Sequence, residues 1–216
     1  MKTNNLLKNE SPHPPLLVRE ISPVCVDAAY AVFRVITGFI YSSVWFVSLA
    51  VYRFFLGFVR LYLLMCKRKA GSKNVYYEYK RYALTACFFL VLSVPAAGII
   101  SLTVLQNAAI TYHGYMIYAC AAYTFYAVTI SIVKLVKYKK SGSPILVAAK
   151  IVCLIAALVA LLELQSSMIA AFSDGDIAFM KTMNALTGAA VFLAIIVTAV
   201  LMLIRAYKNL KGETRE

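Results

Sequence analysis

The chain has 216 residues, of which 62% are hydrophobic and 14% are charged, and its mean hydropathy is +0.77. Soluble globular domains carry about 45–50% apolar and about 25% charged residues, so this composition excludes a water-soluble domain and indicates an integral membrane protein. The net charge of +13 does not indicate nucleic-acid binding, because the basic residues cluster just outside apolar runs.

Residues 1–23 form a polar N-terminal segment that contains proline, asparagine and charges of both signs. The segment lacks the apolar core of a secretory signal peptide, so we expect no cleavable signal here. Its composition predicts a short, poorly ordered tail.

Residues 24–66 form a first membrane segment that is hard to assign. As one helix, its 43 residues would measure about 60 Å, twice the thickness of a bilayer core. Three arginines interrupt it, namely Arg34, Arg53 and Arg60. The longest uncharged run, 35–52, predicts one span, and the residues after it are expected in the inner headgroup region with snorkelling arginines. Alternatively, the segment forms two helices broken near Thr37 and Gly38, one of them in the membrane plane.

Four later segments reach the length of about 20 apolar residues that a spanning helix needs, and they predict a four-helix bundle over 82–207. Their expected limits are 82–105, 112–136, 144–171 and 180–205. With one span in the first membrane segment, the predicted fold is an all-α polytopic membrane bundle of about five transmembrane helices.

Basic residues lie on one side of these spans, in a loop at 67–81, in a loop at 134–140 and near the polar C-terminal tail 208–216. The connections on the other side, "QNAAIT" and "SDGDIAFMK", contain only Lys181 as a base. The positive-inside rule therefore predicts a cytoplasmic C-terminus. Anionic lipid headgroups, and not nucleic acid, are the expected partners of these bases.

Three stretches together resemble an uncharacterised family of small polytopic membrane proteins from gut-dwelling Gram-positive bacteria. They are "DAAYAVFRVITGFIYSSVWFVSLAVY", "GYMIYACAAYTFYAVTISIVKLVKY" and "SPILVAAKIVCLIAALVALLELQSSMIAAF". The resemblance covers most of the chain after the N-terminal tail. It implies a bacterial cytoplasmic membrane and no particular activity.

Glu163 is an acid at the end of the apolar run "ALVALLE". It belongs to a stripe of mostly small residues at helical spacing, the kind that lets a second helix approach closely. The stripe consists of Ala149, Cys153, Ala156, Ala160, Glu163 and Ser167. Counted from Pro144, Glu163 is 19 residues along the helix, about 28 Å, which predicts a position near the outer hydrocarbon boundary.

Three interpretations of Glu163 stay open at this point. It could be an ordinary interfacial acid. It could belong to an outer site with His113, Lys181 and Asn184 that binds a small cation or takes up a proton. It could also pair with Lys181 and only fix helix packing.

Lys150 lies 13 residues before Glu163, on nearly the opposite side of the same helix. It is six residues past Pro144, close to the expected cytoplasmic surface. We therefore expect Lys150 to reach back to the headgroups instead of facing another helix.

Tyrosines form a second stripe on the predicted helix 112–136, all within about 140° of one face. They are Tyr112, Tyr115, Tyr118, Tyr123 and Tyr126. They could line a polar interior, or they could serve as an outer aromatic belt and as ordinary interhelical packing. The run "NALTGAAV" in the last helix predicts close packing through Asn184, Thr187 and Gly188.

The sequence has no motif that indicates an enzyme, a cofactor or a metal. It contains no HExxH, GxSxG or glycine-rich phosphate loop, and its five cysteines form no CxxC or Cys/His cluster. We therefore expect a non-enzymatic membrane protein that works through helix–helix contact with itself, as a homo-oligomer, or with another membrane protein. The alternative is a small oligomeric carrier or channel for a proton, cation or small solute that uses a tyrosine-lined interior and Glu163.

Overall fold

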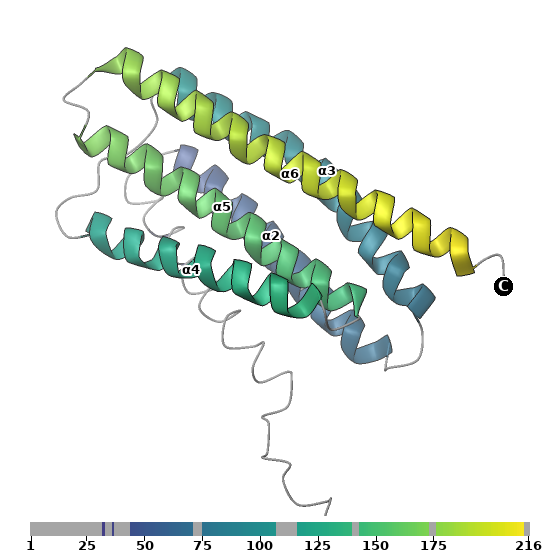
Figure 1. Ribbon diagram of the computed structural model, residues 1–216. Helices are drawn as coiled ribbons and strands as arrows, with labels where there is room; N and C mark the ends of the chain where they lie inside the picture. Colours follow the sequence, from purple (N-terminus) through teal and green to yellow (C-terminus); the bar gives the residue numbers. More distant parts are fainter. Residues whose placement is uncertain are drawn as a thin grey trace, which may run out of the picture.

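Five long helices make up nearly all of the residues that the computed structural model describes (Figure 1). The described residues are 44–70, 75–106, 116–139, 143–172 and 176–213, together with Val32 and Ile36. The helices are α2 (Val44–Ala70), α3 (Val75–Gln106), α4 (Met116–Lys139), α5 (Pro144–Phe172) and α6 (Ile177–Glu213). Each contains a stretch that is long and apolar enough to cross a membrane. The predicted all-α multi-pass bundle is confirmed.

Helix α5 lies at the centre of the bundle, in contact with α2, α3, α4 and α6. More than half of its residues are buried, including most of its small ones. The most extensive contact between two helices joins α3 and α6, which lie side by side along most of their length (Figure 1). Among the described helices, α4 packs against α5 alone. The bundle therefore has one helix surrounded by neighbours and one at its periphery.

The first described span continues past the predicted end at residue 52, whereas the predicted start at residue 35 and the alternative break near Thr37 and Gly38 lie outside the described residues. The structure places it at Val47–Arg68, so the residues expected in the headgroup region cross the bundle. Arg53 and Arg60 do not interrupt the helix because both are buried against other helices, Arg60 to 4% exposure. A charged side chain that is surrounded by protein can stay within the hydrocarbon layer. Hydropathy along the sequence does not show whether such protein surroundings exist.

The helices also extend beyond the limits that hydropathy predicts. The expected basic loop 67–81 is mostly helical, because α2 ends at Ala70 and α3 already begins at Val75. In the same way, α4 includes Lys137 and Lys139, and α6 continues to Glu213, within the predicted tail. Hydropathy marks the hydrocarbon layer, whereas a helix continues into the headgroups, where its charged side chains are solvated.

Gly188 allows the close approach of α6 to α3, as the small-residue run in the last helix predicts. A Cβ atom added at Gly188 would lie 2.5 Å from Cγ2 of Ile100 on α3. In contrast, a Cβ at Gly57 or Gly98 would have no atom within 4 Å. The α3–α6 contact therefore depends on the missing side chain at one glycine.

We predict that Gly188→Ala lowers the thermal stability of the protein in detergent, because Ile100 and the helix behind it must move away. Gly98→Ala is the matched control. There the added methyl group has free space, and alanine is favoured over glycine in a helix by about 1 kcal/mol, so stability should rise slightly or stay the same. Equal shifts of the melting temperature for both variants would contradict the close packing at Gly188.

The orientation of the bundle can be tested by labelling single cysteines placed at Ile177 and Lys211, in a background that lacks the native cysteines. Both positions are exposed, at opposite ends of α6. An impermeant thiol reagent added to intact cells should modify the cysteine at 177 and spare the one at 211, as the positive-inside rule requires. The reverse pattern would show that the basic end of the bundle faces outward.

Candidate functional site

Arg53 of α2 and Glu163 of α5 form a two-point ion pair inside the bundle. The Nε atom of Arg53 is 3.0 Å from Oε1 of Glu163, and its Nη2 atom is 3.3 Å from Oε2. The Glu163 side chain is fully buried, and the Arg53 side chain is 9% exposed. This fork-like arrangement is the strong form of an arginine–carboxylate interaction.

The structure corrects the predicted surroundings of Glu163. Lys181 is exposed on α6 and is not its partner, while His113 lies outside the described residues. The acid is also not an exposed interfacial residue, because α5 continues for nine residues beyond it to Phe172. The prediction that Glu163 faces another helix is confirmed, and that helix is α2.

Arg53 is not expected as the partner from sequence, because its position after the uncharged run predicts the headgroup region. A signal was nevertheless present, since an arginine and a glutamate, each inside a long apolar run, can only be accommodated in hydrocarbon if they meet. Because the first membrane segment contains three arginines, the sequence alone could not choose which of them is the partner of Glu163.

A second polar contact joins α5 to α6 a short distance further along the helix. The Ser166 hydroxyl donates to Oδ1 of Asn184 at 3.0 Å, and the amide of Gln165 donates to the Thr187 hydroxyl. Asn184 is thus brought to α5, as expected, but its bonded partner is Ser166 and not Glu163. Hydroxyl and amide groups of this kind hold transmembrane helices together at about 1 kcal/mol or less per contact.

Lys150 does not snorkel to the headgroups as predicted. The residue is 1% exposed, and its Nζ atom lies 4.7 Å from the centroid of the Tyr138 ring on α4. The prediction assumed that only one side of α5 is buried, whereas α4 covers the side on which Lys150 lies. A cation over an aromatic face is a favourable arrangement in a desolvated place.

The tyrosine stripe of α4 does not line an interior of the single chain. Tyr118 and Tyr126 are 66% and 62% exposed, and Tyr123 is half-buried. Tyr112 and Tyr115 lie outside the described residues. The face that α4 turns toward α5 instead has buried residues seven positions apart. They are Ile117, Thr124, Ser131 and Tyr138.

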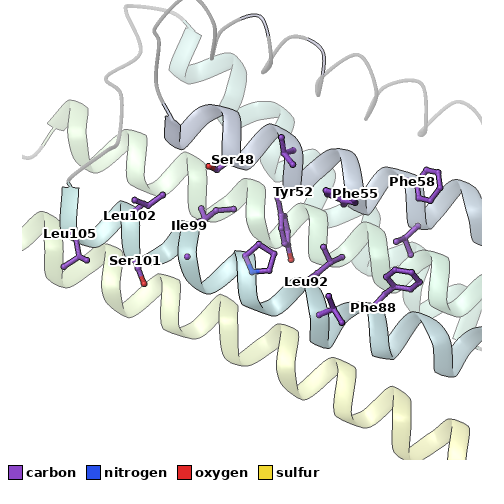
Figure 2. Close-up of a pocket in the computed structure, with 15 residues that line it drawn as sticks. Ser48, Tyr52, Phe55, Phe58, Phe88, Leu92, Ile99, Ser101, Leu102 and Leu105 are labelled. Carbon is purple, nitrogen blue, oxygen red and sulfur yellow. The ribbon is translucent and has the colours of Figure 1, made fainter.

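A large apolar groove lies between α2 and α3, with a volume of about 820 Å³ (Figure 2). It is lined mainly by aliphatic and aromatic side chains, such as Phe55, Phe58 and Phe88. Ser48 and Ser101 lie toward the end at which α2 begins and α3 ends. No charged side chain is among the described residues that line it.

Tyr52 is the polar side chain in the middle of this groove. Its side chain extends from α2 toward α3 (Figure 2). The residue is 3% exposed, and its hydroxyl has no hydrogen-bond partner among the described residues. Tyr52 and Arg53 are neighbours in sequence, so α2 turns the Tyr52 side chain to the groove and the Arg53 guanidinium to α5.

A third polar cluster lies at the basic end of the bundle, where α2 ends and α3 and α5 begin. Glu78, which is 7% exposed, accepts hydrogen bonds from Lys67 and, at 2.6 Å, from the Ser143 hydroxyl. The guanidinium of Arg81 bonds to the Tyr62 hydroxyl and lies over the Tyr77 ring at 4.9 Å. These contacts connect the end of α2 to the beginnings of α3 and α5. The cluster therefore has a structural role.

We predict that Glu163→Gln and Arg53→Gln each lower the free energy of unfolding by about 3–5 kcal/mol, because each leaves the other charge buried without its counter-charge. The double variant should recover much of that loss, since it removes both charges together. Thermal unfolding in detergent checks this, with Lys181→Gln as the control that should change nothing. Additive losses in the double variant would show that the two residues do not act as a pair.

Comparisons with known proteins give no relative from which a function could be transferred. No family model, no curated protein and no solved structure matches the chain. The function must therefore be inferred from the residues and their geometry.

Proposed function

We propose that this protein is a non-enzymatic component of the cytoplasmic membrane that acts through helix–helix contact with a partner in the bilayer. The partner is a second copy of the chain or another membrane protein. The basic end of the bundle, with Lys67, Arg68, Lys139 and Lys211, then lies against the anionic headgroups of the inner leaflet.

The observation that carries this proposal is the peripheral position of α4. Among the described helices it packs against α5 alone, and its opposite face stays exposed. That face combines small or short side chains, Ala122 and Thr129, with the large ones Tyr118, Phe125 and Tyr126. Transmembrane helices associate through such surfaces, because small residues let the backbones approach and aromatic rings fill the space beside them.

The carrier or channel alternative has less support from the geometry. It requires an ionisable carboxylate that faces a solvated path, but Glu163 is fully buried and bonded at both oxygens to Arg53. It also requires tyrosines that surround a common interior, but Tyr118 and Tyr126 point away from the other described helices. A buried ion pair of this kind supports a scaffold more readily than a conduction path.

We expect a photo-crosslinking amino acid at Phe125 to trap the partner in native membranes. Phe125 is 61% exposed on the outer face of α4. Adding Ala122→Trp to this protein should reduce the cross-linked product on the order of tenfold, because the indole blocks the close approach of the partner helix. A loss of about 1.4 kcal/mol of association free energy is enough for a tenfold decrease. Immunoblotting measures the product, and its mass distinguishes a second copy from a different protein.

Ala190→Trp is the matched control for this experiment, because Ala190 is also exposed but lies on α6. It should leave the cross-linked product unchanged. The proposal fails if no protein cross-link forms at position 125, or if the α4 and α6 variants weaken it to the same extent. Thermal unfolding of both variants confirms that the bundle itself is intact.

A further inference from the structure

A small hollow lies at the basic end of the bundle, where α3 and α5 begin and α4 and α6 end (Figure 1). Its volume is about 20 Å³, and polar atoms form part of its surface. Residues from all four helices meet around it. The polar ones are Tyr79 and Tyr82 of α3, Lys139 of α4, Ser143 just before α5 and Arg205 of α6.

Lys139 and Arg205 bring two positive charges to this hollow without a negative one. Neither has an acidic partner within the described part of the chain, and no acid is among the described residues that line the hollow. Glu78 is connected to it only through the Ser143 hydroxyl, which donates to this carboxylate at 2.6 Å, and Lys67 balances its charge. An anion between the two free cations would remove their mutual repulsion.

Tyr82 adds a hydrogen-bond donor to the same place. The residue is 4% exposed, and its hydroxyl forms no hydrogen bond with a described residue. In contrast to the hydroxyl of Tyr52, that of Tyr82 is not completely covered by protein atoms. The Tyr79 ring meets the Tyr82 ring edge-on, with 6.5 Å between the centroids, and supports it. Because a buried tyrosine hydroxyl normally has a partner, this one suits an acceptor in the hollow.

The first turn of α5 adds partial positive charge beside the hollow. Pro144, the first residue of this helix, is one of the lining residues. The first backbone N–H groups of a helix have no acceptor within it, and the helix dipole makes this end favourable for anions. This field adds to the full charges of Lys139 and Arg205.

The size and the depth of the hollow restrict the anion. A volume of about 20 Å³ holds one or two water-sized atoms, so the hollow admits oxygen atoms of a ligand and leaves the rest of it outside. Helix α5 has 29 residues, or about 43 Å, which exceeds the hydrocarbon core of about 30 Å. Its basic end therefore extends into the headgroup layer, where the phosphates of lipids lie.

From these observations we infer that the hollow is a phosphate site, in which Lys139, Arg205 and the Tyr82 hydroxyl bind the non-bridging oxygens of one phosphate group. Its depth favours the headgroup of an anionic phospholipid as the source, and a free phosphate ion is the other source of the same chemistry. The site rests on the part of the proposed function that places the basic end among headgroups. It does not require a partner on α4.

Native mass spectrometry of the full-length protein in a neutral detergent tests this with phosphatidylglycerol and phosphatidylcholine. Both lipids carry a phosphate, but the choline group cancels its charge, so the wild type should bind phosphatidylglycerol more tightly. Replacing both Lys139 and Arg205 by Gln should weaken phosphatidylglycerol binding about thirtyfold, which corresponds to about 1 kcal/mol per cation. The preference for phosphatidylglycerol should be lost with it.

Tyr82→Phe tests the hydroxyl without a change of charge. It should weaken phosphatidylglycerol binding about two- to tenfold, the equivalent of one hydrogen bond. Tyr207→Phe is the matched control, because Tyr207 is exposed on α6 and does not line the hollow. It should bind like the wild type.

The control for net charge is the double variant Lys137→Gln with Lys208→Gln. Both residues are exposed, lie on α4 and α6, and do not line the hollow. This variant loses the same charge as the one at Lys139 and Arg205 but should keep the preference for phosphatidylglycerol. Thermal unfolding without lipid should be the same for all variants, since the groups that they remove form no hydrogen bond or ion pair with a described residue.

Inorganic phosphate, added at millimolar concentration to the lipid-free protein, distinguishes the two sources. A rise in the melting temperature of the wild type that the variant at Lys139 and Arg205 lacks assigns the site to free phosphate. Binding of phosphatidylglycerol without that rise assigns the site to the lipid headgroup.

The phosphate site is ruled out if the two double variants bind phosphatidylglycerol equally, or if Tyr82→Phe binds it like the wild type, because the bases then attract lipid only as a diffuse surface. It is also ruled out if the wild type does not distinguish the two lipids and inorganic phosphate does not stabilise it. Cross-linking at position 125 involves none of these residues, so either proposal can fail without the other.

Discussion

The ion pair between Arg53 and Glu163 is the interaction on which the arrangement of the bundle depends. In hydrocarbon, either charge alone would be costly, but the two-point contact and full burial make the pair compatible with membrane depth. It allows an arginine-containing segment to become the first described span. It also fixes the rotation of α2, because turning Arg53 toward α5 turns Tyr52 toward the groove with α3.

The central position of α5 explains why several side chains have unexpected surroundings. A helix with four neighbours has only a narrow exposed face, so most of the small-residue stripe and the opposite side with Lys150 are buried. The peripheral helix α4 shows the reverse, because one narrow face is enough to hold it. Its aromatic residues are left on the outside, where a bilayer or a partner helix covers them.

The sequence predicted the helices well because hydrophobic length is a direct requirement of the bilayer. It also predicted that Glu163 faces a helix and that Gly188 lies at a close contact, since side-chain size and periodicity are local properties. It could not predict that Arg53 is the partner of Glu163, because the two residues are 110 positions apart. The exposure of Tyr118 and Tyr126 depends on which helix each face meets, and periodicity alone does not contain that information.

The separation of 110 residues between Arg53 and Glu163 has a consequence for how the protein is made. At a synthesis rate of about 5–20 residues per second, Arg53 is made roughly 6 to 22 s before Glu163. During that interval Arg53 and Arg60 have no carboxylate of α5 to meet, so α2 on its own is a poor candidate for stable insertion. Stable insertion of α2 is therefore coupled to the arrival of a helix that is made much later.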